Sequence, residues 1–322
     1  MRRRDFIVLI GGTAAWPLSA VASVPAHVGF VTGADKIAAA DFIKALRDGL
    51  ATLGYIEPSS LKLELTFADY KLERLPTLVA DLERLDVNVI VTHAAATSVV
   101  VKSQRRVPVV YEFSADPISL GIAKDLSHPL DNATGISLMA VELNTKRLEM
   151  LRQIAPEVRR LAVIANPLHP GFDGERAYSE AAAQQLGFET LFFPTPNRAE
   201  LDRALGTLDK KSAHALLVLS DGFMVENRSL IINFAMSRRL PVVSGWAVMA
   251  DSGALCTYGP RLLESYRRTA YFVDRILKGT KPADLPIEQP TVFELVVNLN
   301  SAKALGIAIP QSVLIRADRV IE

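Results

Sequence analysis

The chain alternates short runs of β-branched and aliphatic residues with longer segments whose apolar residues recur at helical spacing. This alternation predicts parallel sheets covered by helices, the α/β class. In the first half it predicts strands at His27–Val31, Leu61–Phe67, Val87–Val91 and Pro108–Phe113. Helices are predicted between these strands, over the apolar series that begin at Phe42 and Leu75 and from about Ala95 onward. Gly54 follows the first helix, where a left-handed C-cap is typical.

The second half repeats this plan. Strands are predicted at Arg160–Ala165, Glu189–Phe193, Ala215–Leu219 and Pro241–Ser244, and helices at Glu175–Leu186, Ala199–Leu208, Asn227–Arg238 and Leu262–Leu277. Val28 and Leu161 are 133 positions apart, as are Pro108 and Pro241. Asn88 and Ala215 are 127 apart. The nearly constant offset predicts two lobes of like topology; the alternative is that any α/β chain yields such matches.

Two such lobes leave a cleft between them, and a ligand of such sheets lies outside the carboxyl ends of the strands. The loops that follow the predicted strands therefore supply the candidate ligand-binding residues. These are Thr32, Gly33, Thr92, Ala94, Ala95, Thr97, Glu112, Ser114, Asp116, Asn166, Asp221, Phe223, Ser244, Trp246 and Tyr258.

The small residues at 94–97 would let an anionic group approach backbone N–H groups at a helix N-terminus, with Ser114 beside them; helix capping by Thr97 is the alternative. Asp221 is the stronger candidate partner for an ammonium group. Asp116 precedes a proline, so it could instead initiate a turn. Asn166 could cap a turn or contact the ligand. Phe223, Trp246 and Tyr258 could stack on a ligand or belong to the core.

Composition narrows the function classes. A length of 322 residues is typical of about two domains. The formal charge of +1 argues against a nucleic-acid surface. The single cysteine, Cys256, excludes an internal disulfide and has an apolar setting typical of a buried side chain. The sequence lacks dinucleotide, P-loop, esterase-elbow and zinc-protease motifs, and its five histidines lack metal-ligand spacing, so neither a cofactor nor a metal is expected.

The N-terminus has the pattern of an export signal. Three arginines at 2–4 precede the apolar run that starts at Phe6, and small residues follow at 20–22. The segment Arg3-Arg4-Asp5-Phe6-Ile7 is similar to a twin-arginine signal. We expect residues 1–22 to be a cleaved signal peptide and the mature protein to be periplasmic. An N-terminal membrane anchor is the alternative.

Several short motifs spread over nearly the whole chain resemble the periplasmic substrate-binding proteins of ABC transporters, in the type I family that includes aromatic amino-acid (tryptophan/tyrosine) binders. The matching segments are the leader, 42–50 with Leu53-Gly54-Tyr55, Asp116-Pro117 with Leu120-Gly121, 132–135, 146–149, Asn166-Pro167, Tyr258-Gly259-Pro260, 275–279, 282–290, Asn298-Leu299 and 302–306. The sequence departs from the family pattern in the loop 92–96, which lacks a glycine, and at Glu112, where an apolar residue is expected.

The resemblance implies two Rossmann-like lobes joined by crossover hinge strands, the type I periplasmic-binding architecture. Lobe 1 is predicted to comprise 24–140 and 254–280, and lobe 2 to comprise 141–253 and 281–322. The lobes would close over a small amino-acid-like molecule or carboxylate and deliver it to a membrane permease, without catalysis.

We expect a monomer with a small-molecule ligand. Three other functions are compatible with the cleft. They are an exported α/β enzyme, a sensory module that reports to a membrane receptor, and the effector lobe of a repressor. The last is disfavoured by the export signal.

Overall fold

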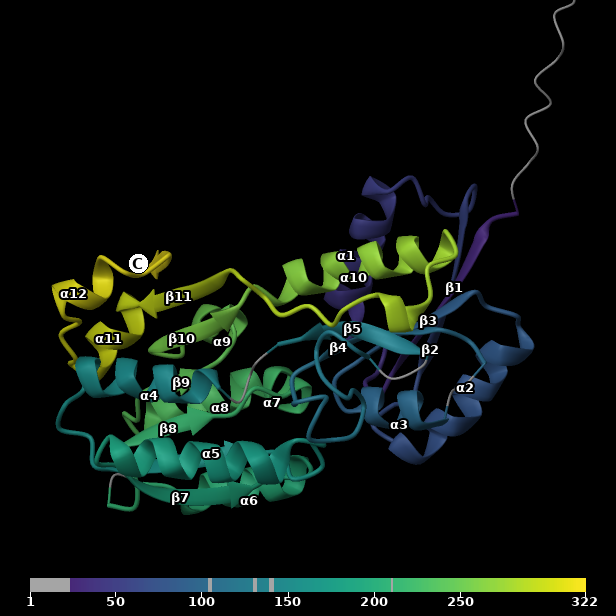
Figure 1. The fold of residues 1–322 in the computed structure, drawn as a ribbon. Coiled ribbons are helices and arrows are strands. Elements are labelled where there is room, and N and C mark those ends of the chain that lie inside the picture. Colours follow the sequence, from purple (N-terminus) through teal and green to yellow (C-terminus); the bar gives the residue numbers. More distant parts are fainter. Residues whose placement is uncertain (1–23, 104–105, 130–131, 139–141, 210) are drawn as a thin grey trace, which may run out of the picture.

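The computed structural model describes residues 24–103, 106–129, 132–138, 142–209 and 211–322. The predicted export signal at 1–22 lies outside these residues. The described chain forms two lobes, each a sheet with helices on both faces (Figure 1). The predicted α/β class and type I architecture are thereby confirmed. Within the described residues no helix is long and apolar enough to span a membrane.

The sheet of the first lobe is parallel throughout, in the order β2-β1-β3-β4-β5. Its strands are β1 (Ala26–Thr32), β2 (Leu61–Phe67), β3 (Val89–His93), β4 (Val109–Phe113) and β5 (Ala133–Ser137). Its helices are α1 (Ala40–Thr52), η1 (Leu72–Arg74), α2 (Leu75–Arg84), α3 (Ala96–Ser103), α10 (Leu262–Leu277) and η2 (Pro282–Asp284). Helices α1 and α10 cover one face and α2 and α3 the other, because alternate strand residues such as Phe30 and Val31 enter separate hydrophobic clusters.

Helix α1 packs closely on α10, and this approach depends on Gly49. A Cβ at Gly49 would lie 2.5 Å from the carbonyl oxygen of Arg267, a distance that real side chains do not tolerate. Gly54, just beyond α1, has a φ of +90° and confirms the predicted left-handed helix end. Gly49 therefore allows α10, which follows the second lobe's β10 in the sequence, to complete the first lobe.

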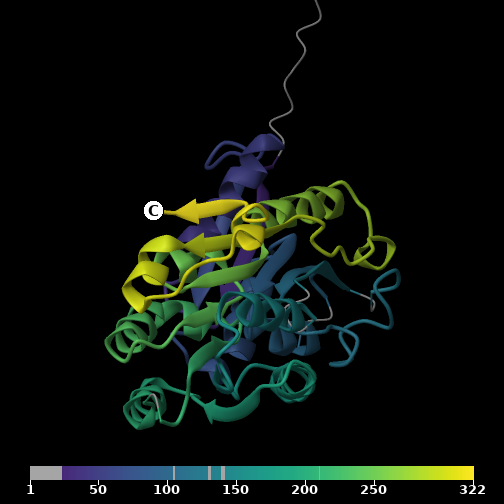
Figure 2. The same ribbon diagram turned by 90° about the vertical axis from the view of Figure 1, so that its left-hand side faces the viewer.

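The sheet of the second lobe has the order β12-β11-β10-β9-β8-β6-β7 and is parallel except where β10 pairs with β11. Its strands are β6 (Arg160–Ala165), β7 (Glu189–Pro194), β8 (Ala215–Val218), β9 (Val242–Ser244), β10 (Cys256–Pro260), β11 (Phe293–Asn298) and β12 (Arg319–Ile321). Its helices are α4 (Leu143–Ile154), α5 (Phe172–Gln185), α6 (Arg198–Thr207), α7 (Gly222–Glu226), α8 (Arg228–Ser237), α9 (Ala247–Asp251), α11 (Leu299–Leu305) and α12 (Gln311–Leu314). Figure 2 views the molecule from this lobe.

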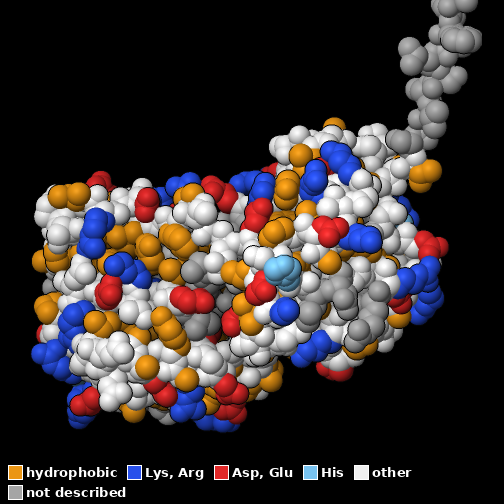
Figure 3. Space-filling model, in the orientation of Figure 1, with side chains coloured by type: hydrophobic (Ala, Val, Ile, Leu, Met, Phe, Trp, Pro, Cys, Tyr) orange, Lys and Arg blue, Asp and Glu red, His pale blue; other side chains and the backbone are white. Residues whose placement is uncertain are grey.

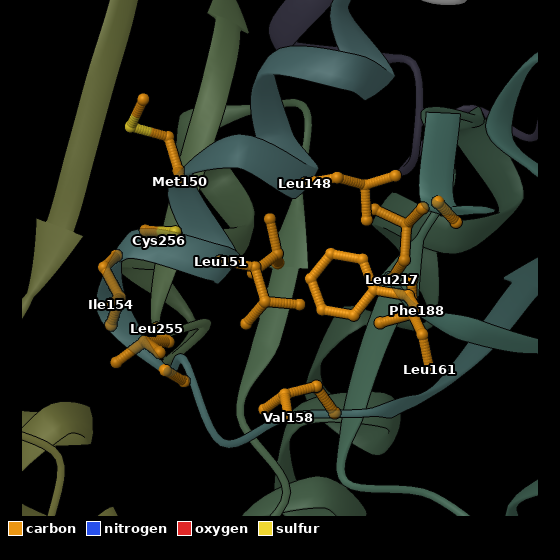
Figure 4. Close-up of a cluster of buried hydrophobic side chains, with 14 of the residues drawn as sticks. Leu148, Met150, Leu151, Ile154, Val158, Leu161, Phe188, Leu217, Leu255 and Cys256 are labelled. Carbon is orange, nitrogen blue, oxygen red and sulfur yellow. The ribbon is translucent and has the colours of Figure 1, made fainter. Parts of the chain in front are cut away.

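One hydrophobic cluster of the second lobe joins α4 and α5 to the sheet. Leu151, Leu161 and Leu217 lie around the ring of Phe188 (Figure 4). Cys256 belongs to the same cluster, is 1% exposed, and has its thiol pKa raised to about 12 by burial. The prediction that it is a buried hydrophobic residue is confirmed.

The segment boundaries of the lobes differ from the prediction at two places. Strand β10, predicted in lobe 1, lies in the second sheet because it pairs with β9 and β11. Residues 282–288, predicted in lobe 2, pack on the first lobe, where the Glu288 N–H donates to the Gly135 carbonyl at 3.0 Å. The chain therefore crosses between lobes after β5, between β10 and α10, and between Glu288 and β11. Charged side chains of both signs are intermixed on the face shown in Figure 3, which agrees with the net charge of +1.

Candidate functional site

A cavity of about 540 Å³ lies between the lobes, at the carboxyl ends of strands from both sheets. Cavities of this size are typical of small-molecule sites. Ten of the predicted residues line it. They are Thr32, Gly33, Ala94, Ala95, Glu112 and Ser114 from the first lobe, and Asn166, Asp221, Phe223 and Trp246 from the second. The carboxyl-end rule therefore located this cavity from sequence.

The other five predicted residues lie outside the cavity. Strand β3 ends two residues later than predicted, so His93, not Thr92, lines the cavity, while the Thr92 hydroxyl is buried. Thr97 is buried in α3.

The three remaining predicted residues make contacts within their own lobes. Asp116 accepts hydrogen bonds from the N–H groups of Ile118 and Ser119, which confirms the turn alternative. The Ser244 hydroxyl donates to the Val218 carbonyl, and Tyr258 stacks on Phe293 in the second lobe.

On the first-lobe wall, a chain of hydrogen bonds joins four side chains. The Thr32 hydroxyl and His93 Nε2 are 2.8 Å apart, and His93 Nδ1 and the Tyr266 hydroxyl are 2.5 Å apart. Tyr266 in turn hydrogen-bonds Glu112. Burial lowers the pKa of His93 to about 4. Burial raises the pKa of Glu112 to about 8, against the hydrogen bond from Tyr266, which lowers it.

Backbone amides at the start of α3 form a second polar feature of this wall. Ala94 has a φ of +51°, a left-handed conformation that alanine rarely adopts. It turns the chain from β3 into α3. Within the described part of the chain, the N–H groups of Ala95 and Ala96 donate no hydrogen bond. A left-handed residue followed by a helix start is an arrangement that binds anions.

The second-lobe wall carries carboxylates. Asp221 Oδ1 accepts hydrogen bonds from the Phe223 N–H at 2.8 Å and from Asn166 Nδ2 at 3.2 Å. Asn166 also caps its own turn, since its Oδ1 accepts from the Leu168 N–H. Asp221 Oδ2 has no hydrogen-bond donor among the described residues. Burial raises the pKa of nearby Glu226 to about 7.

Two side-chain pairs connect the lobes at the cavity. Ser114 Oγ, after β4, is 2.8 Å from His169 Nε2, after β6. Tyr70, after β2, hydrogen-bonds Glu226 of α7. The residues Tyr70, Glu226 and Tyr266 were absent from the predicted site. They come from helices and a turn that no strand-end rule selects, so no sequence signal pointed to them.

The remaining lining residues are largely apolar or aromatic. They include Phe42, Leu72, Leu138, Val225 and Leu262. Arg198 is the cation that lines the cavity within the described chain, and its Nε is paired with Asp202 at 3.1 Å. No cluster of His, Cys, Asp or Glu that could hold a metal occurs among the described residues. The cavity thus offers an apolar interior, backbone donors on one wall and carboxylates on the other.

Comparison with known proteins places these features in context. The model of a family described as ABC transporter substrate binding protein matches residues 28–321. A curated tyrosine-binding protein from Clostridioides difficile strain R20291 is 21% identical over 267 residues, covering 82% of this chain and 75% of the relative. Two solved structures are each 23% identical and cover 92% of this chain and 100% of their own. One is an ABC domain from Streptococcus pneumoniae in complex with L-Trp, with a TM-score of 0.84. The other is a conserved domain protein from Vibrio cholerae, with a TM-score of 0.85.

Proposed function

This chain belongs to the family of ABC transporter substrate binding proteins, and from that premise we propose that it captures an amino-acid-like zwitterion between its lobes. The observation that carries the proposal is that the two opposite walls of the cavity carry complementary groups, a hydrogen-bond donor on one and a carboxylate on the other. The backbone N–H of Ala95, which donates no hydrogen bond within the described residues, belongs to the first-lobe wall of the cavity, and Asp221 belongs to the second-lobe wall. An α-amino acid has one anionic and one cationic group to match them.

The carboxylate of the ligand would bind at the Ala95 and Ala96 amides. These N–H groups begin α3, where the helix dipole favours negative charge. The Ser114 hydroxyl lines the same cavity and can donate a further hydrogen bond. Because the alanine side chains are small, they leave the backbone of this part of the wall accessible to a carboxylate.

The ammonium group would bind Asp221 Oδ2. Oδ1 is already held by Phe223 and Asn166, which fix the direction of the carboxylate. A charge-assisted hydrogen bond to a preorientated carboxylate stabilises a complex more than a neutral one does. The side chain of the ligand would then lie among Phe42, Phe223 and Trp246. The tyrosine-binding relative and the L-Trp complex support an aromatic amino acid as the first class to test.

We further propose that the protein is exported through its N-terminal signal and delivers its ligand to an ABC importer in the cytoplasmic membrane. The family membership supports this role. Closure of the lobes would shift an existing equilibrium between open and closed forms, and the permease would bind the closed form.

One observation bears on the alternative of an exported enzyme. Ser114 and His169 form a Ser–His pair at the cavity. In a serine hydrolase the imidazole accepts the serine proton. Here His169 Nδ1 accepts the Gly171 N–H at 3.3 Å, so the proton of the neutral ring is on Nε2, and Nε2 donates to Ser114. That tautomer cannot act as a base toward Ser114, which favours binding over hydrolysis.

The experiment is a thermal-shift titration with L-tryptophan, L-tyrosine and L-phenylalanine, followed by mass spectrometry of the recovered compound. Ligand at 100 times its Kd adds about 2.7 kcal/mol to the stability, a shift of several degrees. Asp221→Asn should weaken binding by about tenfold or more, since it removes a charged partner. Asp116→Asn, outside the cavity, is the matched control. Equal affinities of the two variants would refute the role of Asp221, and an altered compound would favour the enzyme.

A further inference from the structure

Glu112 is a buried carboxyl group in the wall of the cavity. It lies near the end of β4, lines the cavity and is 3% exposed. Its Oε1 atom is buried and has no hydrogen-bond partner among the described residues. A buried polar atom without a hydrogen-bond partner destabilises the folded protein. A ligand atom that forms a hydrogen bond with Oε1 would remove this cost and so strengthen binding.

The hydrogen-bonded chain described above indicates which protons this wall offers. The Ala34 N–H donates to Thr32 Oγ1 at 3.1 Å, and the Thr32 hydroxyl proton can then be donated to His93 Nε2, which lies 2.8 Å away. His93 is neutral at pH 7, because burial lowers its pKa to about 4. With Nε2 accepting from Thr32, the one ring proton is on Nδ1 and is donated to the Tyr266 oxygen. The Tyr266 proton then points to Glu112. Each member of the chain is satisfied, and Glu112 Oε1 is left at its end.

Within the described residues, no cation acts on Glu112 to stabilise its charge. The titratable group that acts on its pKa is Tyr266 from α10, which is neutral at pH 7, as is His93 from β3, the hydrogen-bond partner of Tyr266. The other titratable residues that line the cavity are Tyr70, Arg198, Asp221 and Glu226. Burial raises the pKa of Glu112 to about 8, so the group keeps its proton at neutral pH and is a donor.

The donor lies beside the proposed anion site. The Ala94 N–H donates to the backbone carbonyl of Glu112 at 3.2 Å, which joins the end of β4 to the turn that presents the Ala95 and Ala96 amides. We propose that the protonated Glu112 carboxyl donates its hydrogen bond through Oε1 to the ligand carboxylate, and so determines the selectivity for an anionic head group. This inference rests on the proposed function.

The proposal requires that binding and protonation of Glu112 are coupled. An anion bound beside Glu112 favours the neutral carboxyl and disfavours the ionised one. Affinity for a carboxylate should therefore be constant below pH 7 and fall by up to tenfold per pH unit above about pH 8. A ligand with a cation in that position would show the opposite dependence, because it would favour ionised Glu112.

The test is calorimetric titration with 3-indolepropionate between pH 6 and pH 10, since this probe keeps a constant charge over that range. Glu112→Gln still donates a hydrogen bond, so its affinity should be near that of the wild type at pH 7 and should not change with pH. Glu112→Leu has neither a donor nor a titrating group, so it should bind about tenfold more weakly than the wild type at pH 7, and its affinity should not change with pH. Asp116→Asn is the control and should keep the wild-type dependence. A wild-type affinity that is flat or rises above pH 8 would overturn the proposal.

A second readout separates this inference from the proposed function. If neither L-tryptophan nor 3-indolepropionate binds, the proposed ligand class is wrong, and acetate becomes the probe for Glu112. The ¹³C resonance of the Glu112 carboxyl, assigned by its loss in Glu112→Gln, is followed against pH with and without acetate. The proposal expects acetate to raise the midpoint of this titration. A midpoint that is unchanged or lowered contradicts it.

Discussion

The hydroxyl of Ser114 in the first lobe and Nε2 of His169 in the second lobe are 2.8 Å apart, and this pair connects the two walls of the cavity. His169 is fixed by the Gly171 N–H and contributes the proton to the contact. Because Ser114 also lines the cavity, the same residue contacts both the proposed ligand space and the opposite lobe.

Ser114→Ala should therefore shift the ligand-free protein toward open forms. Loss of this one hydrogen bond between the lobes should disfavour the form in which they are in contact by about 1 kcal/mol, or about fivefold in population. Small-angle scattering should show a larger radius of gyration. Ser119→Ala, on the exposed loop that follows, is the control. If both variants have the wild-type radius, the contact does not hold the lobes together.

Gly171 limits how closely the lobes approach. A Cβ at Gly171 would lie 2.6 Å from the Cβ of Ala115 in the other lobe, although the φ of −90° is accessible to any residue. We expect Gly171→Ala to hinder closure and to weaken ligand binding. Gly174→Ala in the same helix meets no atom within 4 Å and should stabilise α5 by about 0.5–1 kcal/mol with binding unchanged. Equal ligand affinity in the two variants would be inconsistent with this account.

Ala94 has a left-handed backbone that costs a non-glycine residue about 1–2 kcal/mol. Ala94→Gly should relieve this cost, partly offset by the greater entropy of its unfolded chain, and so leave the stability nearly unchanged. Ala94→Val should destabilise the protein by about 2 kcal/mol and weaken carboxylate binding, because a β-branched side chain resists this conformation. Urea denaturation and ligand titration of both variants measure these effects. A valine variant as stable as the wild type would contradict the strained turn.

Glu112 also predicts a pH dependence of stability. Its pKa is about 8 in the folded protein, against an ordinary value of 4.5, so the unfolded chain releases this proton at lower pH than the folded chain does. The contribution of Glu112 to stability is then complete below pH 4.5 and is lost as the pH rises to about 8. Glu112→Gln should gain stability relative to the wild type across this window. Thermal midpoints at pH 5, 6, 7 and 8 test it; a constant difference between the two proteins would show that Glu112 does not titrate as stated.

The local pattern of the sequence determined the α/β class, most strands and the location of the cavity. Strands β2 and β6 have the predicted bounds, because alternation of apolar residues and the turn residues beside them are local properties. The carboxyl-end rule placed Glu112, Ser114 and Asp221 at the cavity, since it depends only on the parallel direction of successive strands.

Tertiary structure alone decided which side chains meet. Tyr266 reaches His93 from 173 positions away because α10 packs back onto α1, and β10 joins the second sheet through an antiparallel strand that sequence did not predict. Because β3 continues to His93, Thr92 and His93 are strand residues that point to opposite sides, and His93 lines the cavity. The protonation of Glu112 at neutral pH likewise could not be predicted from the sequence. Burial raises the pKa of this carboxyl group, and burial depends on how the lobe packs.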